Sequence, residues 1–212
     1  MRAVMAFSGG MDSTGLLINL LSKGYKVSTL SYDYGQKHVI EIERAKLNIA
    51  YLASKGFEVE HRVVDLKSAM SIFHSALTST DLEVPEGHYE EEQMKATVVP
   101  NRNAIFASIL YGYALSTSIR EDVDVEIALG VHSGDHAIYP DCRPEFYESI
   151  GESFAMGNWD SERVSFNLPY IDGDKTTILR DALRSCQKLG LDFDTVFANT
   201  NTSDNPDDEG RS

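Results

Sequence analysis

A turn rich in serine and glycine near the start of the sequence could hold a phosphate group. Residues 8–14 read SGGMDST and follow a short apolar run. Glycine lets backbone N–H groups approach an anion closely, a helix start adds its positive dipole end, and the hydroxyl groups add further donors. The turn lacks the lysine of a Walker motif and the third glycine of a dinucleotide-binding motif. It therefore predicts a pyrophosphate site of another kind.

Positive residues at the predicted starts of two helices indicate further anion contacts. Arg102 stands where an apolar helical pattern begins. A positive side chain there opposes the helix dipole, so a bound anion explains it better than packing does. Lys175 lies in the first turn of the last helical pattern, and the same argument applies to it more weakly.

Apolar periodicity predicts strands and helices in alternation around these residues. In the first half of the chain, strand and helix patterns alternate at residues 2–7, 13–24, 26–32, 38–55 and 58–65. In the second half, helix and strand patterns cover residues 103–119, 123–130, 145–156, 164–167 and 174–189. Such alternation predicts an α/β fold with a single doubly wound parallel sheet and helices on both faces. The helix at 103–119 is so apolar that we expect it to be buried on most sides.

Composition limits the classes of function. The 212 residues carry 33 acidic and 19 basic side chains, which gives a net charge of −14. This acidity argues against a protein that clamps long DNA or RNA, but not against a local nucleotide pocket. Two cysteines, Cys142 and Cys186, are too few for a disulfide framework or a four-thiolate zinc site. With no secretory signal and no apolar run of membrane-spanning length, we expect a soluble protein of the cytoplasm.

Two segments have no apolar periodicity. Residues 74–98 are polar and include Pro85 and Gly87, which is typical of a solvated loop or, alternatively, of a lid over a site. Residues 199–212 are small, polar or acidic and predict a flexible tail. We therefore expect one domain over residues 1–198, followed by this acidic tail.

The turn at residues 8–14 resembles the pyrophosphate loop of the ATP-pyrophosphatase (PP-loop) superfamily. Members of that superfamily adenylate a carboxylate or carbonyl oxygen and release pyrophosphate. The resemblance implies an adenine nucleotide alpha-hydrolase-like fold. It also implies that Asp12 helps to hold magnesium on the phosphates of ATP, a role that suits a carboxylate. The ATP-binding residues that it implies are Phe7, Ser8, Gly9, Gly10, Met11, Asp12, Ser13, Thr14, Gly15, Leu16 and Leu17.

Four further strings narrow the resemblance to one family. They are YGQKH at 34–38, VPNRN at 99–103, YPDCR at 139–143 and the segment 169–176 that leads into the last helix. Together they resemble the 7-cyano-7-deazaguanine synthase family (QueC), over nearly the whole chain from Ala3 to Phe193. Each string follows a predicted strand or begins a helix, which is the sheet edge where ligands of α/β proteins bind.

The resemblance implies an ATP-dependent ligase. It implies that ATP adenylates 7-carboxy-7-deazaguanine, that ammonia then gives the amide, and that a second adenylation dehydrates the amide to the nitrile. The implied catalytic residues are Asp12, Arg102, Lys175, Arg143 and His38. The implied substrate-binding residues are Tyr34, Gln36, Asn103, Asp135, Tyr139 and Asp141. These small molecules are the expected partners, together with a second subunit, because members of the family commonly pair as homodimers.

Several of these residues also have plainer interpretations. His38 could act as an acid or base near neutral pH, or simply cap the second helix. Asp141 could read a guanine-like edge through its carboxylate, or serve only its own loop. Cys142 is interpreted as a small pocket residue and not as a nucleophile. His132 and His136 flank Asp135 and could form a lone metal site, but we favour the interpretation that they do not.

The sequence departs from the family after Phe193. Family members usually carry a cysteine-rich segment there that binds zinc through four thiolates, whereas residues 194–212 contain no cysteine. We therefore expect no zinc site. Two alternatives stay open. One is a variant that stops at the amide and serves DNA-base modification in a virus, and the other is a different PP-loop adenylating enzyme with another substrate.

Overall fold

The computed structural model describes residues 1–36, 40–73, 99–136 and 139–200. Within these residues, five strands form one sheet in the order β3-β2-β1-β4-β5, and every neighbouring pair is parallel. The strands are β1 (Arg2–Ala6), β2 (Lys26–Asp33), β3 (Glu60–Asp65), β4 (Val125–Ala128) and β5 (Val164–Asn167). The chain lays β2 and β3 on one side of β1 and then returns to lay β4 and β5 on the other.

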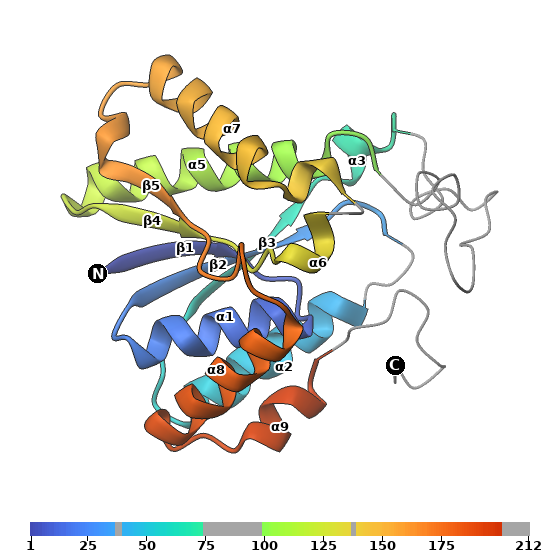
Figure 1. Cartoon of the computed structure of the whole chain (residues 1–212), viewed down its shortest axis with the longest axis vertical. Helices are drawn as coiled ribbons and strands as arrows, with labels where there is room; N and C mark the ends of the chain where they lie inside the picture. The colour runs from blue at the N-terminus through green and yellow to red at the C-terminus, as the bar shows by residue number, and fades with distance from the viewer. Residues whose placement is uncertain (37–39, 74–98, 137–138, 201–212) are drawn as a thin grey trace.

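Helices cover both faces of the sheet (Figure 1). In that view α1 (Met11–Ser22), α2 (Ile40–Ser54), α8 (Lys175–Leu189) and α9 (Phe193–Ala198) lie below the sheet, and α5 (Arg102–Glu121) and α7 (Pro144–Gly157) lie above it. Shorter helical turns are α3 (Lys67–Met70), α6 (Ser133–His136), η1 (Pro140–Cys142) and η2 (Ser161–Arg163). The predicted doubly wound α/β fold is therefore confirmed.

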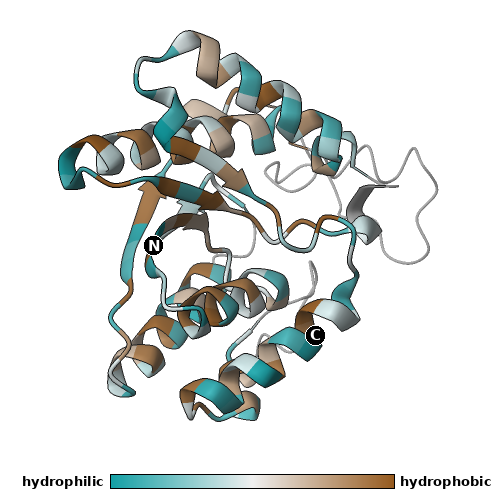
Figure 2. Cartoon of the chain, turned by 60° about the vertical axis from the view of Figure 1, so that its left-hand side comes forward, coloured by the Kyte–Doolittle hydropathy of each residue, from teal (hydrophilic) through white to brown (hydrophobic). Residues whose placement is uncertain are grey.

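The sheet divides the hydrophobic core into two layers. On one side Leu16 and Leu17 of α1 are fully buried together with Ile178 of α8. On the other side Leu110 of α5 is fully buried against Ile127 of β4. Figure 2 shows that the helices carry both hydrophobic and hydrophilic residues, as expected of helices that cover a sheet with one face only. Full burial of such a side chain contributes about 2 kcal/mol, so both layers stabilise the packing of the helices on the sheet.

The strand order reverses at the centre of the sheet. β1 pairs with β2 on one side and with β4 on the other. The loops that follow β1 and β4 therefore leave the same carboxyl edge as neighbours. Ligands of doubly wound sheets bind at such a switch point, so this edge is where a site is expected.

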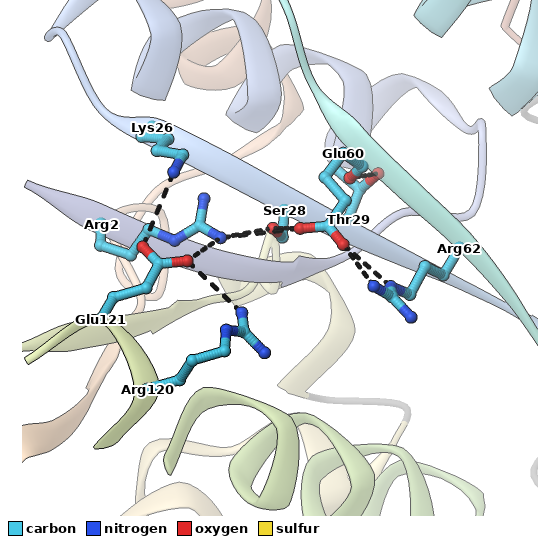
Figure 3. A network of polar contacts seen from close by, with 8 residues as sticks. All are labelled: Arg2, Lys26, Ser28, Thr29, Glu60, Arg62, Arg120 and Glu121. Atoms are coloured by element: carbon cyan, nitrogen blue, oxygen red, sulfur yellow. Dashed lines mark hydrogen bonds and ion pairs between the residues drawn. The ribbon is translucent and has the colours of Figure 1, made fainter. Parts of the chain in front are cut away.

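A polar network ties the strands together at the opposite, amino edge (Figure 3). The guanidinium of Arg2, a residue that is 5% exposed, donates to Ser28 Oγ at 3.0 Å and lies 3.3 Å from Glu121 Oε1. Glu60 accepts hydrogen bonds from Ser28 at 2.8 Å and from Arg62 at 2.6 Å. Because Arg2, Ser28 and Glu60 stand on β1, β2 and β3, the network links three adjacent strands.

Most predicted elements are confirmed, and two differ in an informative way. Helix α1 begins at Met11, two residues earlier than expected, because Gly10 serves as its N-cap. The expectation that the helix at 103–119 is buried on most sides is wrong. Helix α5 buries one face, which includes Leu110 and Ala114, whereas Ile119 is 57% exposed.

Two predicted segments are described only in part or not at all. The predicted loop at 74–98 and residues 201–212 of the predicted tail lie outside the described residues. Asn199 and Thr200 are described, and Asn199 Nδ2 donates to Asn48 Oδ1 at 3.3 Å. In the part of the chain that the structure describes, no helix has the length and apolar character needed to cross a membrane.

Candidate nucleotide-binding site

The predicted phosphate loop, residues 8–14, lies at the carboxyl end of β1 and runs into α1, which begins at Met11. Gly10 N donates to Ser8 Oγ at 3.2 Å, Ser13 Oγ donates to Gly10 O at 3.2 Å, and the two serine hydroxyls lie 3.1 Å apart. These bonds close the turn, and Asp12 lies in the first turn of the helix. The amino end of a 12-residue helix favours an anion, so the local geometry fits a phosphate.

Gly9 and Gly15 serve close packing of helices as well as the turn. Gly9 has a φ of +81°, and a Cβ there would lie 2.8 Å from Ala45 N in α2. A Cβ at Gly15 would lie 2.6 Å from Cγ2 of Ile178 in α8. Real Cβ atoms do not approach so closely, so position 9 requires glycine, and a side chain at position 15 would require Ile178 to shift. The two glycines let α2 and α8 pack against the loop and its helix.

Four other implied ATP-binding residues belong to the core. Phe7, Thr14, Leu16 and Leu17 are each at most 1% exposed. Their side chains pack inside the molecule and are not available to a nucleotide. Contacts of this stretch with ATP would therefore come from residues 8–13 and from backbone groups.

The loop after β4 packs directly against the phosphate loop. A Cβ at Gly130 would lie 3.2 Å from the carbonyl oxygen of Asp12, so a small residue is needed at this crossing. Two residues later His132, which is 4% exposed, places Nε2 at 3.7 Å from Asp12 Oδ2. His132 Nδ1 accepts a hydrogen bond from Gly134 N at 3.0 Å. The carboxylate thus faces an imidazole across the switch point of the sheet.

Four predicted site residues, which we call the Arg102 cluster, gather at the amino end of α5: Tyr34, Arg102, Tyr139 and Asp141. Arg102 makes a side-chain hydrogen bond with Tyr34, and Asp141 and Tyr139 are near enough to act on its charge. Burial disfavours the charged guanidinium, but these neighbours outweigh burial and raise the pKa of Arg102 above its usual value. Arg102 is therefore a fixed, half-buried positive charge. It is surrounded by segments that follow β2 and β4.

Gln36 and Asn103 contact neighbouring parts of the protein. Gln36 Oε1 accepts from Tyr34 N at 2.9 Å, and its Nε2 donates to Tyr32 O at 3.1 Å. The amide of Gln36 thus clamps the turn after β2, which is a second role besides the predicted contact with substrate. Asn103 Nδ2 contacts Sγ of the buried Cys142 at 3.7 Å. This contact links the start of α5 to η1.

A cavity of about 210 Å³ opens between the phosphate loop and α5. Ser8, Asp12 and Ser13 line its polar side, and Phe106 and Tyr147 are among the side chains of its apolar side. Pockets of this kind, mainly apolar with a few convergent polar groups, bind small molecules. The polar side suits phosphate oxygens, and the apolar side suits a planar ring.

Two further predicted cations stand at the starts of other helices. Arg143 is exposed and is the N-cap of α7. Lys175 is exposed and is the first residue of α8, which is capped by the side chain of Asp174. Ser133 N donates to Gly173 O at 3.0 Å, so the start of α8 is tied to the loop after β4.

The remaining predicted residues are not fully described. His38 lies outside the described residues, and so do the side chains of Asp135 and His136. The disfavoured alternative of a metal site at His132 and His136 is therefore not tested by the described residues. Among the described side chains, no group of three or more histidines, cysteines, aspartates or glutamates could hold a metal ion.

The donors around the cavity nevertheless suit magnesium bound together with ATP. Magnesium prefers oxygen ligands and is commonly held by one or two carboxylates plus phosphate oxygens of the substrate. Asp12 supplies a carboxylate, and Ser8 and Ser13 supply hydroxyls, on the same side of the cavity. The residues present therefore fit this ion.

Sequence reasoning misses two parts of this site. Phe106, Leu110 and Tyr147 of the cavity wall are typical helix core residues, because periodicity marks an apolar face without saying what it faces. In the sequence, His132 stands out only as a ligand of a disfavoured lone metal site. The signal for its place beside Asp12 is its position just after a predicted strand, at the sheet edge where ligands bind.

Comparison with known proteins assigns the family. The model of the family described as "Queuosine biosynthesis protein QueC" matches residues 2–211. The chain belongs to the QueC family. Among its relatives is "7-cyano-7-deazaguanine synthase 1" of Colwellia psychrerythraea, which is 41% identical over 196 residues, 92% of this chain and 83% of the relative. The 7-cyano-7-deazaguanine synthase of Alteromonas mediterranea is 44% identical over 91% of this chain and 81% of its own length.

A solved structure also supports the fold of this QueC family member. A 4-thiouridine synthetase, in complex with RNA and with bound ATP, aligns with a TM-score of 0.50 and 16% identity. The alignment covers 93% of this chain and 42% of that one. At this identity the likeness concerns the fold alone.

Proposed function

We propose that this member of the QueC family is an ATP-dependent ligase. It converts 7-carboxy-7-deazaguanine and ammonia to 7-amido-7-deazaguanine and then to 7-cyano-7-deazaguanine, for queuosine biosynthesis. The observation that carries the proposal is the meeting of the phosphate loop and the Arg102 cluster at one edge of the sheet. Relatives that are 41% and 44% identical bear the name 7-cyano-7-deazaguanine synthase, which supports this substrate.

In this proposal ATP lies with its phosphates on residues 8–14. The amino end of α1 and the hydroxyls of Ser8 and Ser13 bind the phosphates. Asp12 would hold a magnesium ion, which neutralises charge on the phosphates and on the departing pyrophosphate. The apolar side of the cavity offers room for a planar ring.

The first half-reaction activates the carboxylate. A carboxylate does not react with ammonia at neutral pH, because hydroxide is a poor leaving group. Its oxygen therefore attacks the α-phosphorus of ATP and pyrophosphate leaves, which forms an acyl-adenylate. The ammonia nitrogen then attacks the acyl carbon, AMP leaves with the C–O electrons, and loss of a proton gives the amide. Arg102, Arg143 and Lys175 are the proposed cations that stabilise the charge developing on the phosphates.

The second half-reaction removes water from the amide by the same means. The amide oxygen attacks the α-phosphorus of a second ATP, and pyrophosphate leaves. The nitrogen loses two protons as the C≡N bond forms, and AMP departs with the former amide oxygen. We propose His38 as the group that accepts or returns a proton in these steps.

Recognition of the deazaguanine ring is assigned to the residues around Arg102. A guanine-like edge presents a ring N–H and an exocyclic amine, and the carboxylate of Asp141 can accept from both. Tyr34 and Tyr139 offer ring faces on which a planar base can stack. Asn103, Gln36 and Asp135 complete the proposed substrate-binding set.

One incubation tests the proposed function. The protein is mixed with ATP, magnesium, ammonium and 7-carboxy-7-deazaguanine, and pyrophosphate and products are measured by a coupled assay and by mass spectrometry. We expect pyrophosphate release that depends on the deazaguanine, with the amide formed first and the nitrile later. Pyrophosphate release only with another acceptor would indicate a different PP-loop enzyme. Amide as the sole end product would indicate a variant that stops there.

Assembly and setting complete the proposal. We propose a single PP-loop domain over residues 1–198, a flexible tail at 199–212, and a homodimer that works in the cytoplasm without binding long nucleic acid. Trp159 and Met156 are 93% and 84% exposed near the end of α7, which offers apolar surface to a second subunit. Cys142 and Cys186 are both buried thiols, which fits a reducing compartment. Sedimentation at twice the mass of one chain would support the dimer.

A further inference from the structure

The ring of His132 is held in one orientation by its own loop. Gly134 N donates to Nδ1 at 3.0 Å, so Nδ1 acts as the acceptor nitrogen. In the neutral ring the proton is therefore carried by Nε2. A Cβ at Gly134 would lie 2.8 Å from Cε1 of the ring, so glycine at this position leaves space for the imidazole.

The nitrogen that carries the proton points at the phosphate loop. His132 Nε2 lies 3.7 Å from Asp12 Oδ2, and the histidine is only 4% exposed. Electrostatic attraction between an N–H and a carboxylate is stronger in such a buried place than in water. Asp12 also lines the cavity, so the same carboxylate lies beside both the ring and the proposed site of the ion.

We propose that His132 is a positioning residue that orients the Asp12 carboxylate for the magnesium ion that accompanies ATP. The inference rests on the proposed function, because it takes Asp12 as the magnesium ligand. The contact crosses the switch point, so it joins the loop after β4 to the loop after β1. Partners that orient a metal-binding carboxylate in this way typically change metal affinity about 10- to 100-fold when they are removed.

The alternative is that His132 only fills space in a buried loop, and the choice of variants separates the two. His132→Gln keeps an N–H donor near the place of Nε2. His132→Asn keeps one only near the place of Nδ1, and His132→Leu keeps neither. Ser133→Ala is the matched control, because it changes the adjacent side chain, whose hydroxyl donates to Gly173 and not to Asp12.

The experiment measures ATP binding by calorimetry at a series of magnesium concentrations, without any deazaguanine, together with the melting temperature of each variant. We expect His132→Leu and His132→Asn to need about tenfold more magnesium for half-maximal binding. We expect His132→Gln and Ser133→Ala to stay close to wild type. Because a loss of packing would lower the melting temperature of His132→Gln and His132→Asn alike, rescue by glutamine alone identifies the N–H as the important group.

Three outcomes would overturn the inference. Unchanged magnesium dependence in folded His132→Leu or His132→Asn would show that the ring does not act through Asp12. Equal defects in His132→Gln and His132→Asn would assign the histidine a packing role. ATP binding by the wild type without any effect of magnesium would remove the metal role of Asp12 as well. The proposed ligase activity is tested separately, since no acyl substrate is present here.

Discussion

Gly9 lies against the backbone of Ala45, so close that a Cβ at position 9 would stand 2.8 Å from Ala45 N. Its φ of +81° is also a conformation that L side chains rarely adopt. Gly9 is therefore required for the packing of helix α2 against the phosphate loop, whether or not a nucleotide is bound. The motif alone does not say whether Gly9 serves the fold or the approach of a phosphate, and the contact with Ala45 shows that it serves the fold.

Replacing Gly9 should cost stability as well as ATP binding. Gly9→Ala must either push α2 away or distort the loop, and we expect a loss of about 2 kcal/mol or more in the free energy of unfolding. Urea denaturation measures it. Gly24→Ala is the matched control, because Gly24 has a similar φ of +82° and a Cβ there would meet no atom of the described residues within 4 Å. The control should lose only about 1 kcal/mol, and equal losses in both variants would contradict the packing explanation.

Replacing Asp12 should remove catalysis and leave the fold intact. Asp12→Asn keeps the shape of the side chain and removes the charge proposed to bind magnesium. We expect the rate of pyrophosphate release to fall at least about a hundredfold with little change in melting temperature. Asp122→Asn is the control, because Asp122 pairs with Arg163 beyond the far end of α5. Pyrophosphate release near the wild-type rate in Asp12→Asn would contradict the proposed role.

The hydroxyl of Tyr34 should matter for substrate through Arg102. Tyr34→Phe removes the hydrogen-bond partner of a half-buried guanidinium, which is then less well oriented toward the reacting phosphate. We expect kcat/KM for 7-carboxy-7-deazaguanine to fall roughly tenfold. Tyr25→Phe provides the comparison, since Tyr25 donates to Glu126 at 3.0 Å in another part of the sheet and should affect stability only. Equal kinetics for the two variants would argue against the Arg102 cluster.

Acid should weaken the network at the amino edge of the sheet. Hydrogen bonds from Arg62 lower the pKa of Glu60 from 4.5 to about 2, despite the opposing effect of burial. A lowered pKa in the folded state stabilises the protein fully above pH 4.5 and progressively less as the pH falls towards 2. The effect is moderated by solvent, because the side chain of Glu60 is 37% exposed.

A pair of glutamate variants tests this pH dependence. Glu60→Gln should lower the melting temperature at pH 7 and make its decline between pH 4.5 and 2 shallower than in wild type. Glu43→Gln is the comparison, because Glu43 is 63% exposed and forms an ion pair with Lys46 of its own helix. The prediction is wrong if wild type and Glu60→Gln decline in parallel.

Periodicity predicts most of the fold, because long helices and buried strands repeat their apolar residues over many positions. The short helix α9 escapes such a prediction, since Phe193–Ala198 is too brief to establish a period. The periodicity of apolar residues does not give the order of the strands in the sheet. For that reason the sequence places His132 at the ligand-binding edge of the sheet but does not pair it with Asp12.

The candidate site is predicted in its motifs and less well in its individual roles. Tyr34, Arg102, Tyr139 and Asp141 do gather in one cluster, as expected if each follows a strand or begins a helix. The hydrogen bonds of the Gln36 side-chain amide with the backbone depend on the particular turn after β2, and such geometry leaves little trace in composition. Which of these residues touch a ligand stays a prediction.

The central place of β1 has a consequence for synthesis on the ribosome. β1 is made first, its neighbour β2 begins at Lys26, and its other neighbour β4 begins only at Val125. Helix α8, whose Ile178 lies over Gly15, comes later still. Until those segments emerge, a nascent chain presents an apolar strand with one unpaired edge. Such an edge can pair with other chains and aggregate, and chaperones bind exposed apolar surface of this kind. The phosphate loop is made before β4 and α8, and it acquires its full support only after both of these elements have been translated.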